Sequence, residues 1–190
     1  MKFSNLPPLT GFEVDFGSTP MLYTPPGCPE QAVAKNKSGL LFSWGINSIA
    51  NGPITSLPMA ADTDAGIFIG VTAYSPVTHL VYVGDPDAIA PFETGLVALR
   101  SQPDCTLALA WQHAEGSYAT SSDNVAPSVA NGIVYVSDGT ANIVYAFDAA
   151  DGRELWNSGS IIGGPVFAPP TVDGRVFVPS GDDRLYAFGL

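Results

Sequence analysis

The hydrophobic residues of this 190-residue chain lie in short runs separated by glycine, proline, asparagine or aspartate. Residues 133–136 and 144–147 are apolar at consecutive positions, which is typical of strands covered on both faces. Residues 12–16 instead alternate between apolar and acidic side chains, which indicates a strand with one buried face. Charged residues make up only 13% of the chain, so long helices carrying Glu–Lys pairs are not expected. The pattern predicts many short strands joined by tight turns.

These strands recur with a long period. The stretch from Pro127 to Phe147 returns about 40 residues later, from Pro170 to Phe188, with its glycines and its Tyr-Ala-Phe run in matching places. A period of this length that carries strands is typical of the blades of a β-propeller. The sequence therefore predicts an all-β domain over residues 1–190, with about four blades of four-stranded antiparallel sheets. We place the blades at 18–58, 66–112, 123–158 and 165–190, with 11–17 as an outer strand.

The number of blades does not decide how the ring is completed. Four blades are the lower limit for a propeller, so we expect the chain to form part of a larger ring of seven or eight blades. An isolated arc would leave two apolar blade faces in water, so the chain could also close as a small ring or pair with a partner. The last unit contains only three of the strands. The strand at 11–17 could complete it, or could finish a preceding blade.

The composition excludes some functions. The net charge is −11, and the seven Lys and Arg residues are scattered along the chain, so a nucleic-acid-binding surface is not expected. No apolar run approaches the roughly 18 residues that a membrane span needs. The 20 glycines and 17 prolines suit short strands and tight turns. Residues 1–8 lack the apolar centre of a signal peptide, so an exported parent protein would have a leader that is missing here.

The two cysteines bear on the cellular compartment of the parent protein. Cys28 and Cys105 lie in loop-like contexts and form no Cys-x-x-Cys motif, so neither a zinc site nor a redox motif is indicated. One disulfide between them would suit an exported protein, and two unrelated free thiols are the alternative. We therefore expect the full-length parent to be periplasmic or extracellular.

Residues 145–156 resemble the pyrroloquinoline-quinone (PQQ)-like repeat of β-propellers. Asp148 and Gly152 suit the turn of the motif, since aspartate bonds back to the backbone and glycine allows positive φ. Trp156, like Trp111 one period earlier, offers a large flat surface for the adjoining blade. The residues that we assign to this structural blade motif are Tyr145, Ala146, Asp148, Gly152, Trp156, Trp111, Gly132 and Gly174.

The resemblance implies two functional classes. Quinoprotein dehydrogenases of this kind bind the quinone and Ca²⁺ on the ring axis, often over adjacent cysteines, with an acidic general base. Other members, including the outer-membrane assembly lipoprotein propeller, bind no cofactor and act as scaffolds. This chain has no adjacent cysteines and no carboxylate–Asn pair that matches the calcium ligands. We therefore assign no catalytic, cofactor-binding or metal-ligating residue.

Isolated polar residues add little to these alternatives. His79 and His113 are far apart in sequence and have no second ligand three or four residues away. The acidic pairs Asp85/Asp87 and Asp182/Asp183 could contribute to Ca²⁺ binding, but they also suit solvated turns.

We predict a non-catalytic propeller that binds or scaffolds a protein partner, or a second copy of itself, through open blade faces, with no cofactor. The alternative is the C-terminal part of a PQQ- and Ca²⁺-dependent alcohol or sugar dehydrogenase.

Overall fold

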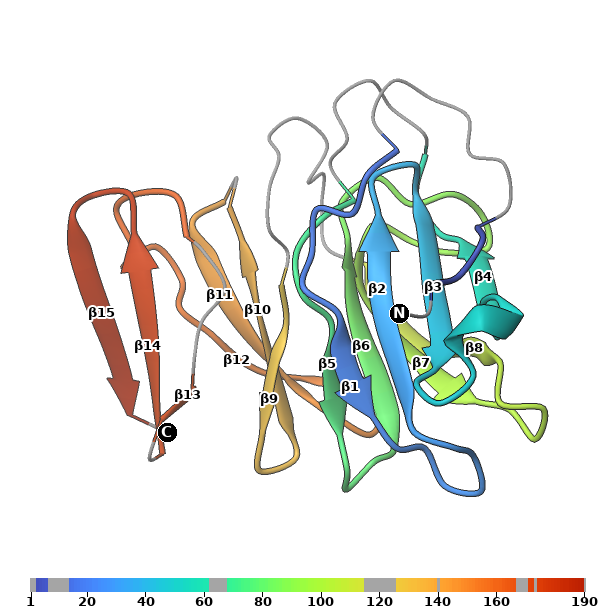
Figure 1. The fold of residues 1–190 in the computed structure, drawn as a ribbon. Coiled ribbons are helices and arrows are strands. Elements are labelled where there is room, and N and C mark those ends of the chain that lie inside the picture. Colours follow the sequence, from blue (N-terminus) through green and yellow to red (C-terminus); the bar gives the residue numbers. More distant parts are fainter. Residues whose placement is uncertain are drawn as a thin grey trace.

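Four separate antiparallel sheets make up the fold in a computed structural model of the chain (Figure 1). The structure describes residues 3–6, 14–61, 68–114, 126–139, 141–166, 171–172 and 174–189. In the first sheet, β1 (Met21–Tyr23), β2 (Gln31–Asn36), β3 (Leu40–Gly45) and β4 (Thr55–Pro58) follow one another, with a 3₁₀ turn at Ile49–Asn51. The second sheet consists of β5 (Ala73–Ser75), β6 (Leu80–Asp85), β7 (Gly95–Ser101) and β8 (Leu107–Ala114).

The third and last sheets repeat this order. The third consists of β9 (Ser128–Ala130), β10 (Ile133–Asp138), β11 (Ile143–Asp148) and β12 (Glu154–Asn157). The last consists of β13 (Thr171–Val172), β14 (Arg175–Ser180) and β15 (Arg184–Gly189), three strands among the described residues. The prediction of an all-β fold with four small antiparallel sheets is confirmed.

The sheets stack face to face in chain order and do not close into a ring (Figure 1). β5 contacts β9, and β9 contacts β13, so the first strand of each sheet lies on the inner side of the arc. Three buried apolar clusters fill the spaces between successive sheets. Most of the hydrophobic stabilisation therefore comes from contacts between neighbouring sheets.

Short turns fix the register within each sheet. Asn131 and Gly132 both have positive φ, 52° and 76°, and they form the two-residue turn between β9 and β10. An Asn-Gly pair suits such a turn because its twist matches that of the flanking strands. The register between the third and fourth strands of a sheet shifts after Ala98 in the second sheet and after Ala146 in the third. These two positions are equivalent, so the irregularity repeats with the blades.

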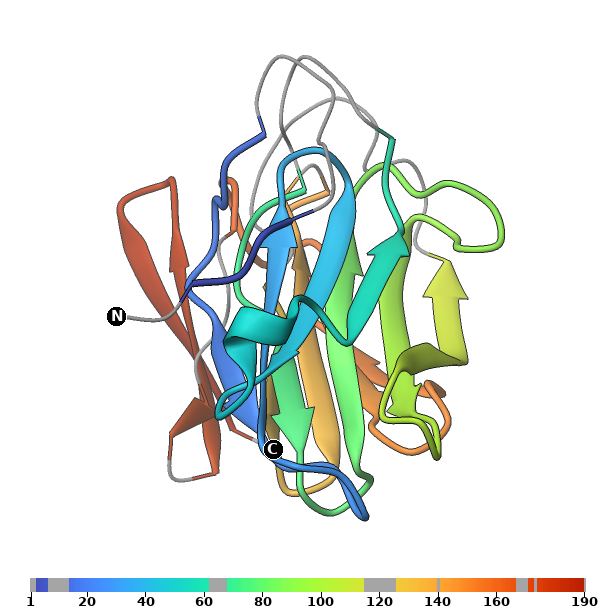
Figure 2. The same cartoon turned by 45° about the vertical axis from the view of Figure 1, so that its right-hand side comes forward.

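The N-terminal segment covers part of the first sheet (Figure 2). The Lys37 amide donates to the Asp15 carbonyl oxygen over 3.0 Å. The Phe16 ring lies 6.0 Å from Phe42 and 5.9 Å from Trp44, measured between ring centroids. Of the outer strand expected at 11–17, residues 11–13 lie outside the described residues.

Residues 14–17 are not in a strand, which corrects the expectation for the described part. They lie against the first sheet rather than beside β15, because Phe16 finds aromatic partners there. In the described part of the chain, no helix is long and apolar enough to cross a membrane.

Candidate functional site

The second and third sheets present the same kind of side chains to the next sheet along the chain. We call this side the forward face of a sheet and the opposite side its rear face. On the second sheet the forward face contains Tyr82, paired with Ala98 across the sheet, and on the third it contains Tyr135, paired with Ala146. In the last sheet Phe177, paired with Ala187, occupies the equivalent position. An aromatic residue opposite alanine is therefore a constant feature of three forward faces.

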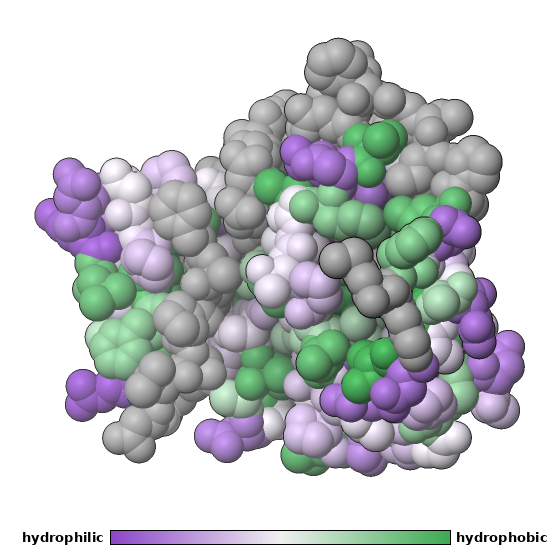
Figure 3. All heavy atoms as spheres, viewed as in Figure 1, coloured by the Kyte–Doolittle hydropathy of each residue, from purple (hydrophilic) through white to green (hydrophobic). Residues whose placement is uncertain are grey.

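The forward faces differ in what covers them. On the second and third sheets, Tyr82, Leu96, Ala98, Tyr135, Val144 and Ala146 are buried against the following sheet. On the last sheet Leu185, at the position of Leu96 and Val144, is 66% exposed. Figure 3 shows hydrophobic atoms at this end of the molecule, over β15, between hydrophilic groups above and below. The forward face of the last sheet thus exposes an apolar side chain at a position that is buried in the two preceding sheets.

The rear face of the first sheet contains a hollow of about 260 Å³. Trp44 lines this hollow and stacks on the fully buried Phe42, with ring centroids 5.6 Å apart. The two residues occupy the positions of Phe188 and Tyr186 in the last sheet. Ala32 stands where the last sheet has Val176. Other apolar side chains that line the hollow are Leu6, Phe16, Pro20, Ala34 and Ile49. Leu6, Leu40 and Ile49 pack against the buried side chains of Ala34, Phe42 and Trp44, so the chain itself covers most of this face.

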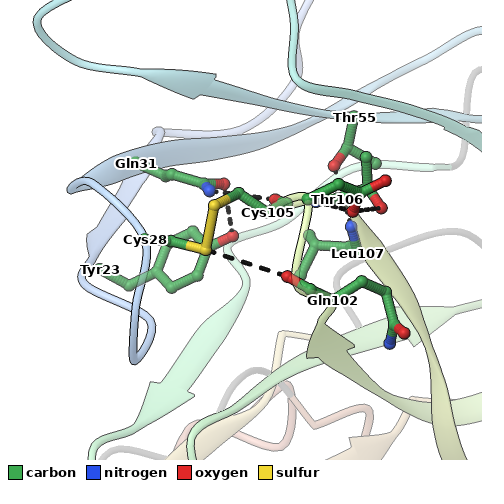
Figure 4. The surroundings of a disulfide bond; sticks show 9 residues. Tyr23, Cys28, Gln31, Thr55, Gln102, Cys105, Thr106 and Leu107 are labelled. Atoms are coloured by element: carbon green, nitrogen blue, oxygen red, sulfur yellow. Dashed lines mark hydrogen bonds between the residues drawn. A yellow bond between two sulfur atoms is a disulfide. The ribbon is translucent and has the colours of Figure 1, made fainter.

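A disulfide joins the first two sheets (Figure 4). Cys28 lies in the turn between β1 and β2, Cys105 lies in the turn between β7 and β8, and their Cα atoms are 5.7 Å apart. Beside it, the Gln31 amide donates to the Cys105 carbonyl oxygen over 3.1 Å. The Tyr23 hydroxyl donates to the Gln31 side chain over 2.8 Å. Covalent and hydrogen bonds therefore hold these two sheets together at one end.

Replacing both cysteines, Cys28→Ser with Cys105→Ser, should lower the free energy of unfolding by about 2–4 kcal/mol. The bond links residues 77 positions apart, so it restricts the unfolded chain strongly. Urea unfolding of the two proteins measures the difference. Adding a reductant should reproduce the loss in the wild type and leave the double variant unchanged. Equal stability of the oxidised wild type and the variant would contradict the prediction.

A buried charge pair also lies between the first and second sheets. Lys35 is fully buried, and its ammonium group donates to the Gly84 carbonyl oxygen over 3.0 Å. It also lies 4.9 Å from the centre of the Phe68 ring. Burial lowers the pKa of Lys35 to about 7, although the charge of Asp85 opposes this shift. Burial raises the pKa of Asp85 to about 7, against the effect of Lys35.

The Asp85 carboxylate is the unusual member of the pair. Both of its oxygens are buried without a hydrogen-bond partner among the described residues. We interpret the pair as a contact between sheets, because Lys35 of the first sheet bonds the Gly84 carbonyl oxygen of the second.

The residues of the blade motif lie in turns and sheet interfaces. Gly152 has φ of 76°, and a Cβ atom added to it would lie 2.5 Å from the Trp111 ring. Trp111 of the second sheet thus packs on a turn of the third. Trp156 lies 5.1 Å from Phe188 of the last sheet, between ring centroids. Asp148 accepts a bond from the Ala150 amide over 2.9 Å, as its role in the turn requires.

The remaining motif residues are near these contacts. Tyr145 stacks on Phe147, with centroids 5.9 Å apart, and Ala146 is buried against the last sheet. Gly132 and Gly174 have φ of 76° and 73° in the turns that precede β10 and β14. Lys35, Phe177 and Leu185 are not among the site residues predicted from the sequence. Phe177 and Leu185 could have been found by aligning the alternating side chains of equivalent strands in successive repeats.

The described residues do not fit a quinone and calcium site. Among them, no group of three or more His, Cys, Asp and Glu side chains could hold a metal ion. His79 contacts the Tyr74 hydroxyl over 3.3 Å, and His113 lies 4.5 Å from the Phe147 ring. Asp182 accepts a hydrogen bond from the Tyr186 hydroxyl over 2.6 Å, within its turn. We therefore derive no chemical step through such a group.

Known structures share this fold. BamB from Moraxella catarrhalis is 18% identical, with a TM-score of 0.59 over 91% of this chain and 49% of BamB. Sqt1 from Saccharomyces cerevisiae is 13% identical, with a TM-score of 0.66 over 94% of this chain and 47% of Sqt1. The computationally designed Ika4 protein is 12% identical, with a TM-score of 0.61 over 96% of each chain. The chain thus spans about half the length of BamB and Sqt1.

Sequence comparison identifies the family. No curated protein sequence matches the chain. Residues 94–189, half of the chain, match the family model described as outer membrane protein assembly factor BamB. The resemblance of residues 145–156 to the PQQ-like repeat is thereby confirmed. The chain belongs to the family of PQQ-like β-propeller repeat proteins that the BamB model describes.

Proposed function

We propose that this chain is a non-catalytic propeller module that binds or scaffolds protein through the open forward face of its last sheet. The observation that carries the proposal is the exposure of Leu185, 66%, at a position that is fully buried in the two preceding sheets. Large exposed hydrophobic patches are rare on monomeric soluble proteins and mark interaction sites. The description of the family as an assembly factor is in keeping with a protein partner.

We further propose that the parent protein works in an oxidising compartment, the periplasm or the exterior of the cell. The bond between Cys28 and Cys105 supports this, because disulfides persist where thiols are not kept reduced.

Titration with the quinone and Ca²⁺ tests the non-catalytic role. We expect no saturable change in melting temperature and no reduction of a dye with alcohols or sugars as substrates, because the described residues offer no metal-ligand group. Ca²⁺ alone and the quinone alone serve as controls. A saturable rise in melting temperature together with dye reduction would overturn the proposal and favour the alternative, a part of a quinoprotein dehydrogenase.

A further inference from the structure

We propose that a pocket between the first two sheets binds the C-terminal residue of a peptide, through its α-carboxylate and the amide N–H beside it. The pocket has a volume of about 370 Å³, within the usual range for small-ligand sites. It lies where the turn after β1, the turn before β6 and the end of β7 come together. The residues that line it are Pro26, Thr78, His79, Arg100 and Ser101. This site is separate from the forward face of the last sheet.

Arg100 provides the positive charge of the pocket. It pairs with Leu80 across the second sheet, at the register position where the third sheet has Asp148. The charge at this position is therefore reversed relative to the blade motif. Arg153 forms an ion pair with Asp148 over 3.7 Å, whereas the Arg100 guanidinium has neither an ion pair nor a hydrogen bond in the part of the chain that the structure describes. A guanidinium offers a planar fork of donors that matches a carboxylate.

His79 has an unusual backbone conformation in this pocket. Its φ is 58°, in the left-handed region, and the equivalent residues before β10 and β14 are Gly132 and Gly174. A residue with a side chain costs free energy in this conformation, whereas glycine adopts it readily. Backbone strain of this kind is often found at ligand-binding sites. The second sheet thus places an imidazole where the next two sheets have no side chain.

Hydrogen bonds determine what His79 and Thr78 can offer a ligand. The Tyr74 hydroxyl donates to the Thr24 carbonyl oxygen over 3.0 Å, so it accepts from the His79 Nδ1–H at 3.3 Å. The neutral ring then presents Nε2 as an acceptor. The Tyr82 hydroxyl donates to a backbone carbonyl oxygen after β11 over 2.8 Å, so it accepts from the Thr78 hydroxyl at 2.6 Å. Both Thr78 and His79 are therefore acceptors toward the pocket.

One cationic donor and two acceptors define the class of ligand. Arg100 binds a carboxylate, and the acceptors of Thr78 and His79 need N–H groups close to that carboxylate. The end of a peptide has both, because its α-carboxylate follows a backbone amide. Inorganic phosphate lacks N–H donors, and the net charge of −11 disfavours a dianion beside a single arginine.

The walls of the pocket are held in place before a ligand binds. The disulfide between Cys28 and Cys105 joins the turn that contains Pro26 to the turn that follows Ser101 (Figure 4). The Tyr74 hydroxyl, which bonds the backbone after β1, links the same two sheets a second time. A pocket that is fixed in this way loses little conformational entropy on binding.

Calorimetric titration with N-acetylated trialanine that has a free carboxylate tests the proposal. We expect saturable binding, and the C-terminal amide of the same peptide should bind about tenfold more weakly or less, because it lacks the charge. Acetate, which has no N–H donor, and inorganic phosphate should also bind more weakly than the acid peptide. Equal binding of acid and amide, tighter binding of acetate or phosphate, or no saturable binding of the acid peptide would overturn the proposal.

Substitutions in the pocket locate the binding site. Arg100→Gln should weaken binding of the acid peptide by about tenfold or more, to the level of the amide. Arg153→Gln is the matched control, because Arg153 lies in the turn between β11 and β12, outside the pocket. His79→Gly introduces the residue of the next two sheets, so it should keep the fold, as circular dichroism can show, and still weaken peptide binding. Unchanged affinity in both pocket variants would place the peptide elsewhere and overturn the proposal. The non-catalytic role is tested separately, by the quinone and Ca²⁺ titration.

Discussion

Lys35→Met is expected to destabilise the chain, by up to about 3–5 kcal/mol where Asp85 stays ionised, and by less at pH 5, where Asp85 is protonated. The substitution removes the ammonium group that faces Asp85 and leaves a buried carboxyl group without an opposite charge. An isolated buried charge is costly, whereas a protonated carboxyl group is far less so. The loss should therefore appear only where Asp85 has to ionise.

The sign of the pH dependence follows from the pKa of Asp85. This pKa is about 7 in the folded chain and 3.8 in the unfolded chain, so the folded state binds more protons between these values. The contribution of Asp85 to stability is complete below pH 3.8 and is lost as the pH rises toward 7. Without Lys35 the pKa of Asp85 rises further, so the loss continues to higher pH.

Urea unfolding at pH 5 and pH 7 measures the effect. This interval lies below the pH range, about 7 to 10.5, in which Lys35 itself releases its proton. The control is the double variant Lys35→Met with Asp85→Leu, which removes both charges and should recover most of the stability. An equal loss at both pH values would show that Lys35 acts through packing alone.

Phe147→Ala should lower the free energy of unfolding by about 3–5 kcal/mol. The Phe147 side chain is fully buried between the second and third sheets, in a cluster with Leu80, Leu96 and Val136. Its removal leaves a cavity that backbone hydrogen bonds on both sides prevent from collapsing. Because neighbouring sheets hold each other mainly through such clusters, this loss should be among the largest for one residue.

Equilibrium unfolding in urea measures this loss, with Leu155→Ala as control. Leu155 lies in β12 and is 42% exposed, so its truncation should change stability by less than about 1 kcal/mol. Similar losses in the two variants would mean that the interface between the second and third sheets contributes little.

The strands and turns were predictable because they depend on local pattern. The Asn131–Gly132 turn and the Asp148–Gly152 turn both follow from residues adjacent in sequence. The repeat then extended these assignments from one blade to the next. For this reason residues 128–189, where the repeat is most regular, were the easiest part of the fold to predict.

The site was less predictable because it depends on contacts between distant segments. Lys35 lies in a strand whose sequence gives no sign that a lysine is buried. Its partners, the Gly84 carbonyl oxygen and the Phe68 ring, come from the second sheet and the segment before it. Phe16 was expected in an outer strand but packs on the aromatic residues of the first sheet. Neither position could be derived from periodicity alone.

The disulfide between the first two sheets gives the two ends of the stack unequal resistance to opening. Each sheet is held mainly by its neighbours, so an end sheet with one neighbour can detach without disturbing the rest. The first sheet is tied covalently to the second, whereas the last sheet has no such bond to the third. Partial unfolding should therefore start at β13–β15, and a partner bound there would protect the weakest part of the chain.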